Sequence, residues 1–402
     1  MSEPVIQPRR RFPAPGPLIA VLVLLLLLGG AAVYFSCDNR AIIAFPGNPA
    51  APEEPEVGGN PGLTEPPFWP EPPQIPRPEF VKGIYVNVLE QPLSEAFFTQ
   101  LVELIDNTEL NAVVIDLKDD RGRLTYSRTR VPWANSAGAP DQYIDHPVEL
   151  IARLSENGIY PIARIVAFKD ALMAEHRPDL AALNSRGEPW RYGADSWLDP
   201  YNKHVWKYVV ALAREAAELG FREIQFDYVR FPSDGNLNDI YYPASDGSPY
   251  HEVIPAFLRY ARASLAEYDV ELSADIFGLV TYDPGDQGIG QHLESIAATV
   301  DLVCPMIYPS HYGAGNLGLE NPDAAPYDTV YRSLQVAVNR LEQAGLETTI
   351  RPWLQAFTIN HLYGAAEVRA QIQAAEDLGI HEFLLWNNGN YYNAAALRPA
   401  DK

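Results

Sequence analysis

The stretch EIQFDYVRFPSDG (residues 223–235) joins a short apolar run to a turn of Pro, Ser, Asp and Gly. Ile224 and Phe226 are typical of a buried strand, yet Asp227 and Arg230 follow at its end. An unpaired buried charge is costly, so these two side chains either face solvent or belong to an ion pair. The first alternative predicts a functional site at the strand end, and the second predicts a structural pair.

Seven further apolar runs have the same character. With 223–231, the predicted strands are 82–87, 112–118, 160–168, 271–278, 302–309, 350–357 and 383–388. Most are apolar throughout, as in a parallel sheet whose outer face is covered. Helical patterns lie between several of these strands, at 94–107, 147–157, 204–219, 329–344 and 365–378. Three of the helices run into Gly220, Gly345 and Gly379 just before a strand, as expected of αβ connections.

Eight strands with helical crossovers in roughly 320 residues predict an α/β fold, the (β/α)₈ or TIM barrel. The eighth helix is expected to be short, near 391–398. A doubly wound open sheet is the alternative, but that fold usually has a Gly-rich phosphate loop after its first strand. The segment VLEQPLS (88–94) contains no such loop.

Residues 17–35 carry no charge and, at 1.5 Å per residue, would span about 28 Å as a helix, roughly a bilayer core. Three arginines, 9–11, precede them. The positive-inside rule then predicts a signal-anchor, with a basic tail (1–16) in the cytoplasm and the remainder on the extracytoplasmic side of the cell membrane. A cleaved signal peptide and lipidation at Cys37 are the alternatives.

Residues 36–79 are predicted to form a disordered, semi-rigid linker. Twelve prolines fall between Pro46 and Pro78, with Gly, Glu and Asn among them. Such a composition cannot bury enough apolar surface to fold alone. The linker would hold the barrel domain, residues 80–402, away from the lipid bilayer.

The formal net charge of −22 argues against nucleic acid and other polyanions as partners, since phosphate binding needs clustered Lys and Arg. Motifs for metalloenzymes, Ser hydrolases and phosphate-binding loops are absent from the sequence, so no metal or other cofactor is predicted. A metal bound by Asp116, Asp119 and Asp120 is the alternative.

In a barrel of this kind the site lies at the C-terminal ends of the strands. The residues predicted there are Asn87, Asp116, Lys118, Arg164, Lys169, Asp227, Arg230, Asp275, Tyr308, Gln355, Trp386 and Asn387. The long segments 119–146, 169–203, 232–253 and 310–328 follow strands on the same face and are rich in Trp and Tyr. Aromatic faces above an acidic floor suit sugar rings, although these aromatics could instead pack the loops onto the barrel.

Four segments carry a resemblance to a known family: EIQFDYVRFPSDG, VVIDLKDDRG (113–122), SADIFG (273–278) and CPMIYPSHY (304–312). They resemble a bacterial family of glycoside-hydrolase-like (β/α)₈ domains, over about residues 80–390. The resemblance implies a barrel and a carbohydrate substrate, either a polymer or an oligosaccharide.

Glycoside hydrolysis usually needs two carboxyl groups. Asp227 is the predicted nucleophile and Asp275 the predicted general acid/base of a retaining enzyme, because neighbouring strand ends give the short carboxyl separation. This placement is similar to that of the alpha-amylase superfamily. Asp116 could replace either member. Arg230 or Arg164 would keep Asp227 ionised.

The remaining predicted residues would contact substrate. They are Arg230, Arg164, Lys118, Tyr308, Gln355, Trp386 and Asn387. The alternative function is a non-catalytic carbohydrate-binding barrel at the cell surface. It would be preferred if the two carboxyl groups lay more than about 10 Å apart or were sealed by arginine.

Overall fold

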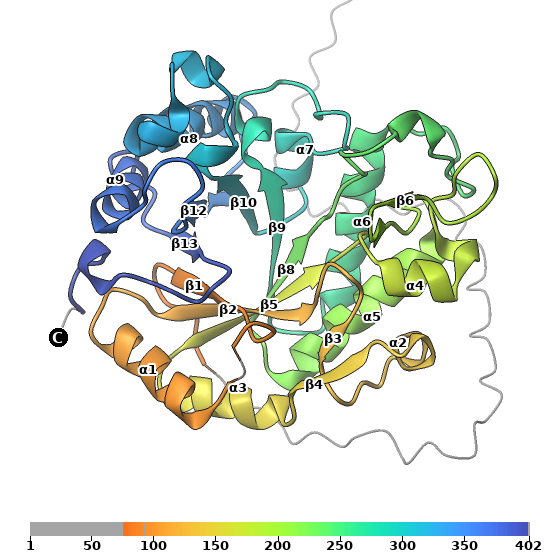
Figure 1. Cartoon of the computed structure of the whole chain (residues 1–402), viewed down its shortest axis with the longest axis horizontal. Helices are drawn as coiled ribbons and strands as arrows, with labels where there is room; N and C mark the ends of the chain where they lie inside the picture. The colour runs from red at the N-terminus through yellow and green to blue at the C-terminus, as the bar shows by residue number, and fades with distance from the viewer. Residues whose placement is uncertain (1–74, 92, 401–402) are drawn as a thin grey trace, which may run out of the picture. The chain divides into compact units, whose positions relative to one another are not determined.

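Eight parallel strands close into a barrel in the computed structural model, which describes residues 75–91 and 93–400 (Figure 1). Each strand pairs with the next, and β1 closes the ring by pairing with both β2 and β13. In barrel order the strands are β1 (Lys82–Val86), β2 (Ala112–Lys118), β5 (Tyr160–Val166), β8 (Glu223–Asp227), β9 (Glu271–Phe277), β10 (Leu302–Ile307), β12 (Trp353–Gln355) and β13 (Phe383–Trp386). The predicted (β/α)₈ barrel is confirmed.

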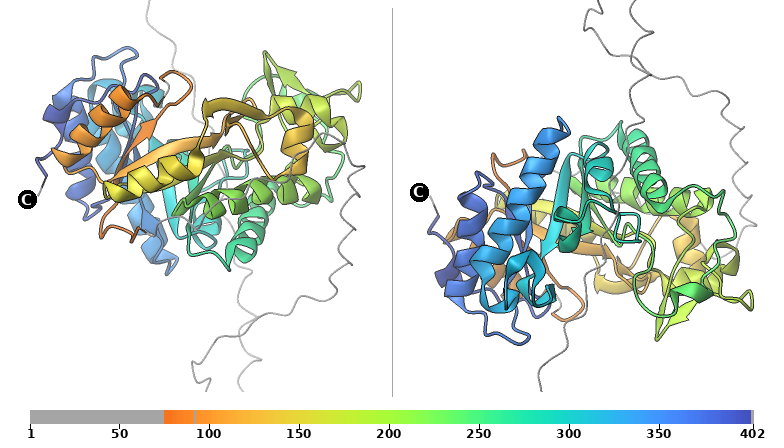
Figure 2. Two further views of the ribbon diagram at one scale, coloured as in Figure 1. Left: turned by 90° about the horizontal axis from the view of Figure 1, so that it is seen from below. Right: turned by 90° about the horizontal axis from the view of Figure 1, so that it is seen from above.

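Helices cover the outside of the barrel, as the two turned views show (Figure 2). They are α1 (Glu95–Asp106), α3 (Pro147–Glu156), α5 (Lys203–Leu219), α6 (Tyr250–Leu265), α7 (Leu293–Ala297), α8 (Pro326–Gln343) and α9 (Ala365–Glu376). A 3₁₀ turn at Ala394–Ala396 takes the place of an eighth helix, close to where a short one was predicted. Helices α6 and α7 were not among the predicted helices.

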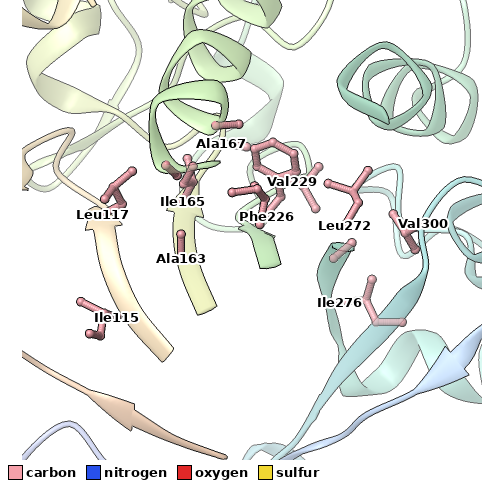
Figure 3. Close-up of a cluster of buried hydrophobic side chains, with 14 of the residues drawn as sticks. Ile115, Leu117, Ala163, Ile165, Ala167, Phe226, Val229, Leu272, Ile276 and Val300 are labelled. Carbon is pink, nitrogen blue, oxygen red and sulfur yellow. The ribbon is translucent and has the colours of Figure 1, made fainter. Parts of the chain in front are cut away.

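The pleat of the strands separates two apolar cores. Side chains that point outward, such as Ile115, Ile165 and Phe226, pack beneath the helices (Figure 3). Side chains that point inward, such as Val114 and Ile162, form a smaller cluster inside the barrel. This division explains why the strands are apolar throughout rather than alternating.

Two strands differ from their predicted extents. The predicted strand 350–357 is split into β11 (Thr349–Ile350) and β12 by Pro352, which has no N–H to donate to a neighbouring strand. The predicted strand 223–231 ends at Asp227, because Tyr228 adopts a left-handed conformation with φ 46°. Arg230 therefore lies in the loop after β8 and not on the strand.

The connections after β2 and β5 carry small elements of their own. The first holds β3 (Leu124–Tyr126), α2 (Pro132–Ala137) and β4 (Pro140–Ile144), and the second holds α4 (Ala171–His176) and the hairpin of β6 (Arg191–Tyr192) with β7 (Asp195–Ser196). The two insertions meet, since the Leu172 N–H donates to the Arg121 carbonyl over 3.1 Å. They build up one side of the C-terminal face.

The N-terminal end of the barrel is closed by ion pairs. Arg351 and Glu223 pair there with no exposed surface on either side chain. Arg77 donates to Glu271 over 2.6 Å and to Glu382 over 2.7 Å. Residues 75–79, the described part of the predicted linker, thus lie against the barrel. The predicted anchor at 17–35 lies outside the described residues, and within residues 75–91 and 93–400 no helix is long and apolar enough to cross a membrane.

Candidate active site

Arg164 joins two carboxylates inside the mouth of the barrel. From β5, its Nη2 and Nε lie 2.5 and 3.0 Å from Oδ2 of Asp227, the last residue of β8. Its Nη1 lies 2.6 Å from Oδ1 of Asp116 on β2. Burial acts against the charged guanidinium, but the two carboxylates outweigh it and raise the pKa of Arg164 well above its usual value. Arg164 therefore stays positively charged between the two carboxylates.

Asp275 stands beside Asp227 on the neighbouring strand, since Phe226 of β8 is paired with Ala274 of β9. Only 1 % of Asp275 is exposed, and its Oδ1 accepts a hydrogen bond of 2.7 Å from Nε1 of Trp353. Burial and then the negative charge of Asp227 raise the pKa of Asp275 well above its usual value. Asp275 thus has the raised pKa expected of a general acid, beside a second carboxyl group that is paired with arginine.

Asp116 uses both of its oxygens within the protein. Oδ1 accepts from Arg164, and Oδ2 accepts the hydroxyl hydrogen of Tyr85 over 2.6 Å. The Tyr85 ring stacks on Trp386 with 3.9 Å between ring centroids. Asp116 is therefore held between Arg164 and Tyr85, and its predicted part in catalysis stays a prediction.

Tyr308 and Trp386 are two predicted contacts at the ends of β10 and β13, in the mouth of the barrel. Tyr308 follows β10 and is 8 % exposed, and burial, with Asp275 and Asp227, raises its pKa well above the usual value. Trp386 ends β13, and its ring centroid lies 5.2 Å from Cζ of Arg164. Tyr308 therefore lies within electrostatic reach of Asp275 and Asp227, and Trp386 within reach of Arg164.

Three other predicted contacts are occupied within the protein. Lys118 has no exposed surface and pairs with Asp170 at 3.0 Å. Gln355 is also fully buried, and its side chain ties Ser310 to Phe357. Asn387 donates to the carbonyl of Ala356, just after β12, over 2.6 Å and accepts from the N–H of Gly389. These side chains hold the loops and do not project into the cleft.

Arg230 does not pair with Asp227, contrary to one of the two predicted arrangements. Its Nη1 donates instead to the carbonyl of Phe231 over 2.9 Å and to the hydroxyl of Ser233 over 3.2 Å. The left-handed turn at Tyr228 carries Arg230 away from the barrel axis. The ion pair of Asp227 is made by Arg164.

Two cavities differ in their position relative to these groups. One of about 80 Å³ lies at the C-terminal face, where Tyr228 follows Asp227, and its lining residues are Lys169, Trp190, Tyr192, Asp195, Trp197, Tyr228, Arg230 and Asp234. A larger one of about 590 Å³ lies at the N-terminal end, against Arg77 and Glu271. Residues at that end of a (β/α)₈ barrel serve stability, so the smaller cavity belongs to the site.

The loop aromatics divide between packing and exposure. Trp190 and Trp197 are 3 and 5 % exposed, so they mainly pack the loop after β5. Tyr192 and Tyr241 are 54 and 59 % exposed on the same side of the barrel. In the described part of the chain no group of three or more His, Cys, Asp or Glu side chains could hold a metal ion.

Two functional residues were missed by the sequence analysis. Tyr85 and Trp353 each lie two residues before a predicted strand-end residue, Asn87 and Gln355. Side chains two apart on a strand share a face, so the inward face of β1 and β12 already contained both rings.

Comparisons with known proteins agree with this architecture. A family model described as "Putative glycosyl hydrolase domain" matches residues 83–392. A hypothetical protein from Ruminiclostridium thermocellum is 37% identical over 48% of this chain and 96% of its own, with a TM-score of 0.44. The glycoside hydrolase domain of PgaB (BpsB) from Bordetella bronchiseptica is 13% identical over 77% of this chain and 94% of its own, with a TM-score of 0.57. None of the curated proteins compared with the chain matches it.

Proposed function

The chain belongs to this family of glycosyl hydrolase domains, and on that premise we propose that it hydrolyses glycosidic bonds in a polysaccharide or cell-envelope glycan. One observation carries the proposal: Asp227 is paired with a charged arginine, while its neighbour Asp275 is buried with a raised pKa. The reaction requires a proton donor beside a second carboxyl group, and the raised pKa of Asp275 supports it as the donor.

The proposed mechanism retains the anomeric configuration. Neighbouring strands lie about 4.8 Å apart, which suits the carboxyl separation of about 5–5.5 Å in retaining enzymes. Asp275 gives its proton to the leaving glycosidic oxygen as Asp227 attacks the anomeric carbon and forms a covalent glycosyl ester. Asp275, now a base, takes a proton from water, which attacks the same carbon and releases Asp227. Trp386 and Tyr308 would stack on the sugar.

The contacts between Arg164 and Asp227 favour a second function, the binding of glycan without cleavage. Two nitrogens of Arg164 contact one oxygen of Asp227, and the other oxygen accepts the N–H of Tyr228 over 2.5 Å. A carboxylate so held, next to an Asp275 that is 1 % exposed, suits a barrel that binds glycan without cleaving it. This binder is the alternative against which hydrolysis has to be tested.

We also propose that residues 17–35 anchor the barrel at the extracytoplasmic side of the cell membrane. Their 19 uncharged residues and the preceding arginines support this. The full-length chain should sediment with membranes, and deletion of 17–35 should release it. Sedimentation of both forms alike, or of neither, would contradict the anchor.

The proposed reaction is tested by counting new reducing ends that the full-length chain releases from a panel of polysaccharides. Replacing Asp275→Asn removes the proton donor, so turnover should fall by about 10²–10⁴-fold while the fold persists. Asp328→Asn, on the surface of α8, is the matched control and should keep full activity. An Asp275→Asn variant as active as wild type would remove Asp275 from the mechanism.

A further inference from the structure

Arg230 is a buried cation without a carboxylate partner. Its residue is 5 % exposed, and none of the described carboxylates lies within 4.0 Å of its guanidinium nitrogens. Three aromatic rings surround it instead, with centroids 4.5, 4.9 and 5.0 Å from Cζ, belonging to Phe277, Trp197 and Tyr228. Burial lowers the pKa of Arg230, so the charge is held at a cost in free energy.

The other charged side chains of the 80 Å³ cavity are Lys169, Asp195 and Asp234. Lys169 pairs with Asp120 at 2.9 Å and with Asp195 at 3.0 Å. Asp234 accepts the hydroxyl hydrogen of Ser233 over 2.7 Å, and its charge acts on Arg230 without an ion pair between them. Within the described part of the chain, Arg230 is therefore the cation of this cavity that has no ion pair.

Two edges of the Arg230 guanidinium differ. Nη1 is used by the carbonyl of Phe231 and the hydroxyl of Ser233, whereas Nε and Nη2 donate to no described residue. The edge formed by Nε and Nη2 is the one that grips a planar carboxylate with two parallel hydrogen bonds. An arginine retained in a cavity beside a reactive centre, with that edge unused, has the chemistry of a ligand contact.

We propose that the Arg230 cavity binds a carboxylate carried by the glycan, such as that of a uronic acid, next to the sugar whose bond is broken. The proposal deepens the proposed function and rests on it for the position of the scissile bond. The exposed ring of Tyr192 and the edge of Trp197 would lie along the same sugar. Tyr228 orients the subsite, because its left-handed turn directs Arg230 into the cavity.

The net charge of −22 limits which acidic glycans fit. A uniformly charged polyanion would be repelled by the whole molecule, but charges more than about 8 Å away are largely screened at physiological salt. The subsite therefore suits a glycan whose carboxylates are spaced by neutral sugars. Glucuronoxylan and hyaluronan have that spacing, whereas polygalacturonate and alginate do not.

The test uses the full-length chain and pairs of polymers that differ only in the carboxylate. Glucuronoxylan, hyaluronan, polygalacturonate and alginate are each compared with their carboxyl-reduced forms, beside neutral xylan and cationic chitosan. Binding is followed by affinity electrophoresis and turnover by reducing ends. The acidic form of a spaced polymer should be preferred by roughly ten- to a hundredfold over its reduced form, as for a charge-assisted bidentate contact.

Arg230→Gln should bring this ratio close to one, and Arg230→Lys should restore only part of it, because an ammonium cannot make the bidentate contact. Arg186→Gln, an exposed arginine in a surface pair with Glu188, is the control and should leave the ratio unchanged. Circular dichroism and melting temperature confirm that each variant is folded.

Several outcomes overturn the proposal. Equal use of acidic and reduced forms by the wild type, a preference for xylan or chitosan, or an unchanged ratio in Arg230→Gln would each do so. A stronger preference for a sulfated form of the same backbone would replace the carboxylate with a sulfate. Hydrolysis without acid preference refutes this inference alone, whereas Arg230-dependent binding without hydrolysis supports it and refutes the proposed reaction.

Discussion

The hydrogen bond from Trp353 to Asp275 opposes the burial of that carboxyl group. Nε1 of an indole can only donate, so it favours the ionised form of Asp275, while burial and Asp227 favour the protonated form. Burial and the charge of Asp227 outweigh the hydrogen bond, so the pKa of Asp275 is raised. Trp353 thus limits how far the pKa rises and fixes the direction of the carboxyl group, which makes it a positioning residue.

Replacing Trp353→Phe should raise the pKa of Asp275 further. A general acid works only when protonated, so activity is lost as pH rises through its pKa. The alkaline limb of the kcat/KM profile should therefore move to higher pH, and the acidic limb should stay in place. Trp386→Phe, whose ring contacts Trp353 edge-on at 5.5 Å between centroids, is the control and should not move the alkaline limb. A limb that moves to lower pH in Trp353→Phe would show that the bond does not act on Asp275.

At the same scale, the pairing of Asp227 could be predicted only as a choice between two arginines. Arg164 and Arg230 are equally near Asp227 in a barrel whose strands are known only from their apolar pattern. The positive φ of Tyr228 settles the choice, and Tyr gives no sequence signal for a left-handed conformation as Gly would. The roles of Asp227 and Asp275 remain proposals, but their adjacency followed directly from the strand order.

At the scale of the elements, the ion pairs at the N-terminal end of the barrel show how burial changes the contribution of an ion pair to stability. Arg351 and Glu223 are both without exposed surface, whereas the side chain of Arg77 is 28 % exposed in its pairs with Glu271 and Glu382. Removing one partner of a fully buried pair leaves an uncompensated charge. Partly exposed pairs contribute less because water replaces the lost partner.

Arg351→Met should lower the free energy of unfolding by about 3–5 kcal/mol. Arg77→Ala should lower it by only about 1 kcal/mol, because its pairs are partly solvated. The double variant Arg351→Met with Glu223→Leu should recover most of the loss, since a buried ion pair is often replaced by apolar residues at little cost. Urea denaturation measures all three. Equal losses in the free energy of unfolding for Arg351→Met and Arg77→Ala would show that burial does not set the contribution of these ion pairs.

Element positions were predictable where the apolar pattern was strong, and much less so in the insertions. All eight barrel strands were expected, but α6 contains Pro255, and a proline inside a helical pattern usually marks a helix end. Helix α7 has five residues, too few to show a period. The short strands have two to five residues: β3 pairs with β2 and β4, and β6 pairs with β7. Runs so short carry too little pattern to predict such pairing.

For the whole molecule, the fold is common to enzymes and binders, so the carboxyl pair has to distinguish them. Arg164 places a positive charge beside Asp227, but it also holds the oxygen that a nucleophile would use. Hydrolysis therefore requires substrate to displace part of this contact. Hydrolysis and binding would use the same aromatic residues at the C-terminal face, so only a measurement of turnover distinguishes the two functions.

The most direct measurement compares Asp227→Asn with the wild-type full-length chain on the glycan that binds best. New reducing ends and affinity are measured on the same samples, with Asp328→Asn as the control. Hydrolysis by a nucleophile predicts that turnover disappears in Asp227→Asn while affinity for the glycan is largely kept. Binding by both proteins with no turnover by the wild type, or turnover that survives in Asp227→Asn, would contradict the central claim.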